Sequence, residues 1–186
     1  MTIVLASASP RRAALLTAAG FAFTIRVADA DETPHVGEAA DALVQRLALT
    51  KAHAVPCAAG ELVLAADTTV VCDGAILNKP ADAAEAARML RRLSGRAHEV
   101  LTGVALRSGD DVETFVERTV VWMAPLDEND IAWYVASGEP EGKAGAYGIQ
   151  GLASRFVTRI DGSYTNVVGL PVAQVAERLR RWGARG

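Results

Sequence analysis

The sequence has few of the residues that build covalent or metal-bound frameworks. It contains two cysteines and three histidines in 186 residues. Cys57 and Cys72 show neither a metal-ligand spacing nor the pattern of a disulfide framework. We therefore expect a fold that depends on neither zinc nor disulfides.

Long hydrophobic runs and an excess of basic charge are also missing. No stretch of 18 apolar residues occurs, and no basic segment followed by a long apolar stretch opens the chain. The 22 acidic residues outnumber the 19 basic ones, for a formal charge of −3, so no general field attracts nucleic acid or an anionic membrane. We expect a cytoplasmic protein without nucleic-acid or membrane partners, in which any anion site is local.

Common catalytic and nucleotide-binding signatures do not occur either. The chain has no Walker A loop, GxGxxG fingerprint, GxSxG elbow or HExxH helix, and no internal repeat or long Pro/Gly/Ser linker marks a boundary. A length of 186 residues suits one domain or two closely joined lobes.

The most informative stretch is Leu62–Val71, an apolar run interrupted by Asp67 and two threonines. Such a run predicts a buried strand. A carboxylate is costly to bury unless it binds a cation or finds hydrogen-bond partners. Asp67 therefore either only caps a strand end or binds nearby amides, or it serves as a metal ligand or general base at the carboxyl end of the strand.

A second candidate lies at the N-terminus, where the strand expected at Thr2–Ala6 runs directly into a helix with Ser9 as N-cap and Pro10 as its first residue. Arg11 and Arg12 in the first turn oppose the usual preference for acidic residues there. Either an anion docks on the helix N-terminus, or the serines only cap and the arginines are solvated.

The remaining pattern predicts an alternation of strands and helices. We expect a hairpin turn at Asp73-Gly74 and another at Asp161-Gly162, and helical apolar spacing elsewhere. The expected strands cover residues 21–27, 98–108, 112–124, 155–160 and 163–168, and the expected helices cover residues 38–55, 82–94, 127–137 and 172–182.

Several charged residues add to the candidates. Lys51 lies near the end of the helix expected at 38–55, Lys79 follows the first hairpin, Lys143 lies in a glycine-rich segment, and Glu32 in an acidic loop is our choice for a second metal-site carboxylate. Each could instead be simply solvated. Together with Asp67, such cations and carboxylates suit attack on a phosphate ester or anhydride, whose developing charge must be offset.

Several motifs in order resemble the Maf family of nucleotide pyrophosphatases. The similarity spans Leu5 to Pro171 and rests on Leu5-Ala-Ser-Ala-Ser-Pro-Arg-Arg12, Ala66-Asp-Thr-Thr-Val70, Asn78-Lys-Pro80, Leu93-Ser-Gly95, Leu101-Thr-Gly103, Tyr134-Val-Ala-Ser-Gly-Glu-Pro140, Lys143-Ala-Gly-Ala-Tyr-Gly-Ile-Gln-Gly151 and Val167-Val-Gly-Leu-Pro171.

This resemblance implies a fold and an activity. The fold is a single α/β domain over residues 1–186, with an elongated mixed β-sheet flanked by helices and two lobes around a cleft, similar to inosine triphosphatases. The activity is hydrolysis of a nucleoside triphosphate between its α and β phosphates, with Mg²⁺ or Mn²⁺, commonly by a homodimer. Modified pyrimidine nucleotides stay open as substrates.

The resemblance also assigns roles to residues of this chain. Asp67 matches the family's proton acceptor. The segment Ile149-Gln150-Gly151 is similar to the subfamily that takes dTTP and UTP, and the Gln150 amide can both donate to and accept from a pyrimidine edge. Polar and phosphate-binding positions match Ser7, Arg11, Arg12, Lys51 and Lys79, and substrate-preference positions match Arg12, Thr68 and Gln150.

Two other functions stay open. The chain could be a nucleotide-binding regulator of septum formation or cell division without significant turnover, although a pure sensor would not require Asp67 beside Glu32. A nuclease or phosphomonoesterase is disfavoured by the acidic balance of charge and would not release pyrophosphate.

Overall fold

The computed structural model describes residues 1–27 and 29–184. Within these residues it contains a mixed seven-stranded sheet with the strand order β2-β1-β3-β5-β6-β7, and β4 pairs with β3. Parallel pairs join β1 to β2 and β3, whereas β3 with β4 and β6 with β7 are antiparallel. The strands are β1 (Thr2–Leu5), β2 (Phe23–Ile25), β3 (Glu61–Cys72), β4 (Ala75–Leu77), β5 (Ala97–Ser108), β6 (Asp111–Met123) and β7 (Val157–Asp161).

Helices flank this sheet, which confirms the expected α/β class. None of the helices in the described part of the chain combines the length and hydrophobicity needed to cross a membrane. The helices are α1 (Pro10–Ala18), α2 (Ala40–Ala54), α3 (Ala83–Leu93), α4 (Glu128–Ala136), α5 (Tyr164–Val168) and α6 (Val172–Arg181), with 3₁₀ turns η1 (Ala144–Ala146) and η2 (Leu152–Arg155).

The chain forms two compact units. The first unit comprises Met1–Asp67, Thr102–Glu117 and Gly169–Gly186, and the second comprises Thr68–Leu101 and Arg118–Val168. Strands β3, β5 and β6 contribute residues to both.

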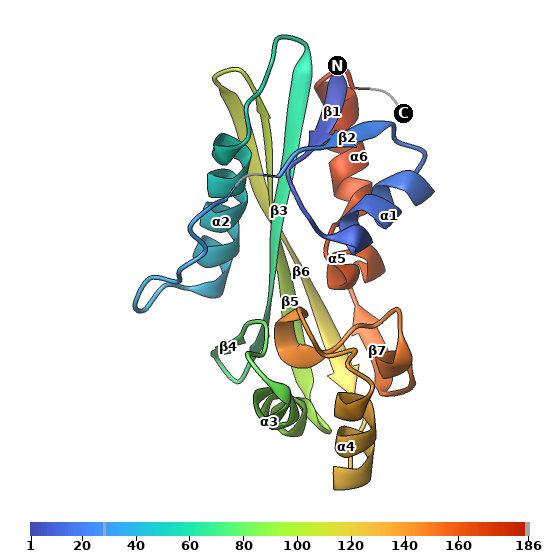
Figure 1. The fold of residues 1–186 in the computed structure, drawn as a ribbon. Coiled ribbons are helices and arrows are strands. Elements are labelled where there is room, and N and C mark those ends of the chain that lie inside the picture. Colours follow the sequence, from blue (N-terminus) through green and yellow to red (C-terminus); the bar gives the residue numbers. More distant parts are fainter. Residues whose placement is uncertain (28, 185–186) are drawn as a thin grey trace. The chain divides into compact units, whose positions relative to one another are not determined.

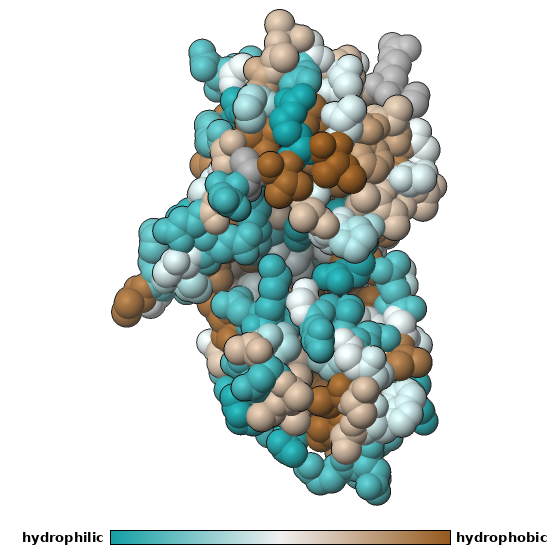
Figure 2. Space-filling view, in the orientation of Figure 1, coloured by the Kyte–Doolittle hydropathy of each residue, from teal (hydrophilic) through white to brown (hydrophobic). Residues whose placement is uncertain are grey.

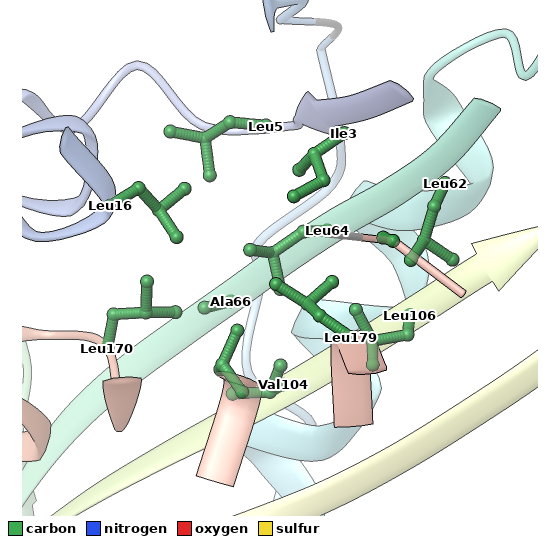
Figure 3. Packing of buried hydrophobic residues seen from close by; sticks show 12 residues of the cluster. Ile3, Leu5, Leu16, Leu62, Leu64, Ala66, Val104, Leu106, Leu170 and Leu179 are labelled. Carbon is green, nitrogen blue, oxygen red and sulfur yellow. The ribbon is translucent and has the colours of Figure 1, made fainter. Parts of the chain in front are cut away.

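In the first unit, β1 and β3 lie between two hydrophobic clusters. The odd residues of β1 and the even residues of β3 face α1 and α6, because successive side chains of a strand point to opposite faces. Figure 3 shows this cluster closely packed around Leu64. Its fully buried members include Ile3, Leu5, Leu16, Leu62, Leu64, Val104, Leu106, Leu170, Val175 and Leu179.

The opposite face of these strands packs against α2. Val63 and Ala65 belong to the same buried cluster as Ala48 and Ala52, and in Figure 1 α2 lies on the other side of β3 from α1 and α6. The apolar residues that recur at helical spacing in the expected helix 38–55 are all buried: Leu43, Val44, Leu47, Ala48 and Ala52. The helical spacing of apolar residues therefore predicted this face correctly.

Helix α2 approaches the sheet unusually closely at Gly103. A Cβ atom placed on Gly103 would lie 2.2 Å from the carbonyl oxygen of Val44, far inside van der Waals contact. The glycine thus lets the backbone of α2 rest on β5, and this contact sets the position of the helix that carries Lys51.

The first predicted hairpin is confirmed in the second unit. Cys72 pairs with Ala75 across Asp73-Gly74, and both turn residues have positive φ, 50° and 73°, as a type I′ turn requires. The long strands expected around residues 109–110 are β5 and β6, with bounds within one residue of those predicted.

The second predicted hairpin is wrong. Strand β7 pairs with β6 rather than with residues 163–168, and those residues instead form the short helix α5 after Ser163. The Ser163 hydroxyl accepts a hydrogen bond from the backbone N–H of Asn166 at 3.2 Å. The fully buried Asn166 amide donates to the Val100 carbonyl oxygen and to Thr119 Oγ1, both at 3.0 Å. These tertiary bonds outweigh the strand preference of the local sequence.

Two smaller predictions also need correction. Strand β2 covers only Phe23–Ile25 of the expected 21–27. Apolar spacing in the expected helix 82–94 also predicts a buried Ala83, but Ala83 is exposed at the start of α3. The buried residues of this helix are Ala86, Met89, Leu90 and Leu93.

Candidate functional site

Asp67 and Lys51 form an ion pair in the first unit. Asp67 has the same strand parity as Val63 and Ala65 and so lies on the face of β3 that packs on α2. Lys51 follows Ala48 by three residues, which brings its side chain to the same face. Lys51 Nζ donates to Asp67 Oδ1 at 2.5 Å, and both side chains are 14% exposed.

Glu32 joins this pair from the loop between β2 and α2. Its Oε1 lies 3.0 Å from Lys51 Nζ. The loop is held against α2 by Arg46, which binds both carboxylate oxygens of Glu38 at 2.6 and 2.7 Å and the carbonyl oxygen of Thr33 at 3.1 Å. Figure 2 shows an isolated hydrophobic group at the tip of this loop, where Val36 is fully exposed.

Ser7 and Arg12 lie at the junction of β1 and α1. Arg12 Nη1 donates to Ser7 Oγ at 3.1 Å and Arg12 Nε donates to the carbonyl oxygen of Gly169 at 2.8 Å. Ser9 is the N-cap residue and Pro10 the first helical residue, as predicted, but the Ser9 side chain makes no capping bond. Instead the Ser9 N–H donates to the buried hydroxyl of Ser7 at 3.2 Å.

The charges around α1 favour an anion. Burial lowers the pKa of Arg12, the neighbouring positive charge of Arg11 lowers it further, and the negative charges of Asp67 and Glu32 act in the opposite direction. Burial also lowers the pKa of Arg11. The first turn of α1 contains no acidic residue, so no acid offsets the charges of Arg11 and Arg12 at a helix N-terminus that is itself positive. A bound phosphate would relieve this repulsion.

The other predicted residues lie in the second unit. Thr68 follows Asp67 on β3 and is half-buried, Lys79 is exposed after β4, and Gln150 is exposed in a turn. The main chain at Asn78, next to Lys79, is fixed because its carbonyl oxygen accepts from the Gly145 N–H at 3.3 Å. The role in phosphate binding that the sequence suggests for Lys79 stays a prediction.

Two carboxylates of the first unit are arranged as ligands of a divalent cation would be. Glu32 and Asp67 both reach a single cationic group, Lys51 Nζ, so their oxygens converge on one point. Mg²⁺ prefers oxygen ligands and is commonly held by one or two carboxylates together with substrate phosphates. The described residues contain no group of three or more His, Cys, Asp or Glu side chains that could hold a metal without such help.

The sequence interpretation missed Glu139, which organises the glycine-rich segment. Its carboxylate accepts from the Tyr134 hydroxyl at 2.8 Å and from the N–H groups of Leu152 and Ala153 at 2.8 and 3.3 Å. The clustering of glycines was the available signal: a Cβ on Gly151 would lie 2.2 Å from Glu139 Oε2.

A protein-family model described as Maf-like protein matches residues 2–182. The chain belongs to the Maf family. Its similarity to the relatives described below extends over nearly the whole length of this chain and of each relative.

Three Maf relatives illustrate this similarity, and each is named dTTP/UTP pyrophosphatase. The protein of Anaeromyxobacter sp. is 55% identical over 97% of this chain and 89% of its own. That of Symbiobacterium thermophilum is 52% identical over 97% and 94%, and that of Geobacter sulfurreducens 52% identical over 98% and 97%.

A solved structure, that of the Staphylococcus aureus Ham1 protein, is similar to part of this Maf chain. The TM-score is 0.45 at 16% identity, over 67% of this chain and 72% of the other.

Proposed function

We propose that this Maf protein hydrolyses dTTP and UTP between the α and β phosphates and releases the nucleoside monophosphate and pyrophosphate. The relatives named for this activity are at least 50% identical to it over almost their full length. The observation in the structure that carries the proposal is the carboxylate of Asp67, fixed by Lys51 at 2.5 Å on the unit that also presents the two arginines of α1.

Asp67 would act as the general base. Its carboxylate accepts a proton from a water molecule, and the water oxygen forms a bond to the α-phosphorus while the bond from that phosphorus to the bridging oxygen breaks. The electron pair of the broken bond leaves with pyrophosphate. Lys51 holds the carboxylate in one orientation through the bond to Oδ1, so that the base is positioned before substrate arrives.

Arg11, Arg12 and the N-terminus of α1 would bind the phosphates. Guanidinium groups pair well with phosphate oxygens, and free N–H groups of a helix N-terminus add to them. The anchoring of Arg12 by Ser7 and the Gly169 carbonyl supports a fixed position for its positive charge. We assign Lys79 to the same task from the family resemblance.

Glu32 and Asp67 would hold the divalent cation. When bound, Mg²⁺ or Mn²⁺ would neutralise charge on the polyphosphate and its leaving group. Chelation should abolish turnover, and added metal should restore it. A readout independent of activity is Mn²⁺ binding followed by electron paramagnetic resonance, in which Glu32→Gln should bind more weakly than wild type.

Base selection would involve Gln150, Thr68 and Arg12. The direct test of the proposal is a nucleotide panel that includes dTTP, UTP, CTP, ATP, GTP and modified pyrimidine triphosphates, with separate detection of pyrophosphate and orthophosphate. Pyrophosphate released fastest from dTTP and UTP supports the proposal. Orthophosphate release would indicate a phosphomonoesterase, and tight binding without turnover would indicate a regulatory protein.

Three further expectations from the sequence belong to this proposal. They are that residues 1–186 act as one domain, that the protein is a homodimer, and that it works in the cytoplasm. Light scattering of the purified protein tests the second.

A further inference from the structure

The turn that carries Gln150 is held from both sides by one pair of side chains. The Gly151 N–H donates to the Gly148 carbonyl oxygen at 3.1 Å, which closes a turn with Ile149 and Gln150 at its centre. Ile149 is 8% exposed and anchors the turn in the core, whereas Gln150 is exposed. The turn is therefore anchored by a buried side chain and leaves the side chain of Gln150 exposed.

Tyr134 holds the residue before this turn. Its ring is fully buried on α4 and packs edge-on against Phe156, with centroids 5.7 Å apart. Its hydroxyl accepts from the Gly148 N–H at 3.1 Å and donates to Glu139 Oε1 at 2.8 Å. One hydroxyl thus links the start of the turn to the carboxylate of Glu139.

Glu139 holds the residues after the turn. Its two oxygens accept from the N–H groups of Leu152 and Ala153, and a side chain at Gly151 would collide with Oε2. Burial opposes ionisation of Glu139, but the bonds from Leu152, Tyr134 and Ala153 outweigh that effect and lower its pKa. The carboxylate is therefore an acceptor for three donors and has none of its own to offer.

We propose that Glu139, together with Tyr134, is a positioning residue for substrate selection because it fixes the turn that presents Gln150 to the nucleotide base. This inference rests on the proposed function, since it requires that Gln150 contacts the base. Glu139 and Tyr134 are not expected to touch the substrate. Both act through the backbone on either side of Gln150, so they should affect recognition of the base rather than the chemistry at Asp67, which belongs to the other unit.

The main test is Glu139→Gln. The glutamine side chain keeps one acceptor oxygen, but an NH₂ group replaces the other. That NH₂ group would face a backbone N–H that the carboxylate of Glu139 now accepts from, so this backbone donor would lose its partner. We expect KM for dTTP and UTP to rise about tenfold, the scale of effect expected when a backbone donor loses its carboxylate partner. The preference for UTP over CTP should fall by a similar factor while kcat stays within about twofold. Backbone amides at Gly148, Leu152 and Ala153 should exchange with deuterium faster.

The matched control is Glu141→Gln, an exposed acid two residues away, which should keep wild-type KM and selectivity. Tyr134→Phe is the second variant: it removes the hydroxyl that joins Gly148 to Glu139 and should shift KM and selectivity in the same direction. If Glu139→Gln does not fold, Tyr134→Phe decides alone.

The outcomes separate this inference from the proposed function. If wild-type protein releases no pyrophosphate from dTTP or UTP, the proposed function fails. If it does, but Glu139→Gln and Tyr134→Phe keep wild-type KM and selectivity, the positioning role is wrong. A loss of kcat that follows a loss of thermal stability, with selectivity unchanged, would also overturn it, because that result describes a purely structural residue.

Discussion

Replacing Asp67 by asparagine separates catalysis from stability. Asparagine keeps an acceptor oxygen for Lys51 Nζ, so the 2.5 Å contact changes from an ion pair to a hydrogen bond from a charged ammonium to a neutral amide oxygen. That exchange costs about 1 kcal/mol, and Glu32 remains as a charged partner of Lys51. For a chain of this length we expect the melting temperature to fall by about 2–4 °C.

The same change should nearly abolish turnover. Removal of a general base costs about 10²–10⁴ in rate, so kcat for pyrophosphate release from dTTP and UTP should fall by at least about a hundredfold. The assay follows pyrophosphate by ³¹P NMR, which distinguishes it from orthophosphate, and circular dichroism monitors the fold.

A matched control is Asp73→Asn in the turn that ends the same strand. Asp73 pairs with Arg96 at 2.5 Å, but both side chains are 55% exposed, and surface pairs contribute little. Asparagine also tolerates the positive φ of this position. Asp73→Asn should keep wild-type activity. If Asp67→Asn retains more than about a tenth of the wild-type rate, Asp67 is not the base.

Three further predictions test other parts of the molecule. Gln150→Glu should weaken the use of dTTP and UTP, because it replaces an amide donor with an anion beside the base; unchanged selectivity in the nucleotide panel would contradict base reading by this side chain. Burial lowers the pKa of His98 to about 4, below its unfolded value near 6.5, so the native state binds fewer protons and loses up to about 3 kcal/mol of stability as pH falls from 6.5 to 4. Thermal melts of wild type and His98→Gln over this range should therefore differ in slope, and parallel profiles would show that His98 does not cause the loss. Gly103→Ala should place a methyl group 2.2 Å from the Val44 carbonyl oxygen, cost about 1–3 kcal/mol and lower both the melting temperature and the activity that depends on Lys51; an unchanged melting temperature would show that α2 shifts freely.

Local sequence patterns predicted most of the regular structure because tertiary contacts agree with them. The apolar stripe of α2, the turn at Asp73-Gly74 and the N-cap at Asp82, whose carboxylate accepts from the Glu85 N–H at 2.7 Å, each follow from residues close in sequence. The prediction of a strand at residues 163–168 was wrong because tertiary contacts override the local pattern there. The β-branched residues of this segment and the preceding Asp-Gly favour a hairpin, but the helix depends on Asn166 bonds to residues 47 and 66 positions away.

The same distinction governs the candidate site. The contact between Lys51 and Asp67 follows from two periodicities, since strand alternation turns Asp67 toward α2 and helical spacing turns Lys51 toward β3. Glu139 has no such periodic signal. Apart from the Tyr134 hydroxyl, its partners are backbone N–H groups, which carry no residue-type information and lie 13 and 14 positions further along the chain.

The position of Glu32 could be predicted only in part. Its acidic loop marked it as a candidate, but its approach to Lys51 depends on the Arg46 bonds to Glu38 and Thr33, which tie the loop to the helix that carries Lys51. One helix therefore positions both the cation and the second carboxylate, and its own position is set by the contact at Gly103. A shift of α2 would move Lys51 and Glu32 together relative to Asp67, so the geometry of the carboxylate pair is determined by the packing of a helix on a glycine rather than by the charged residues themselves.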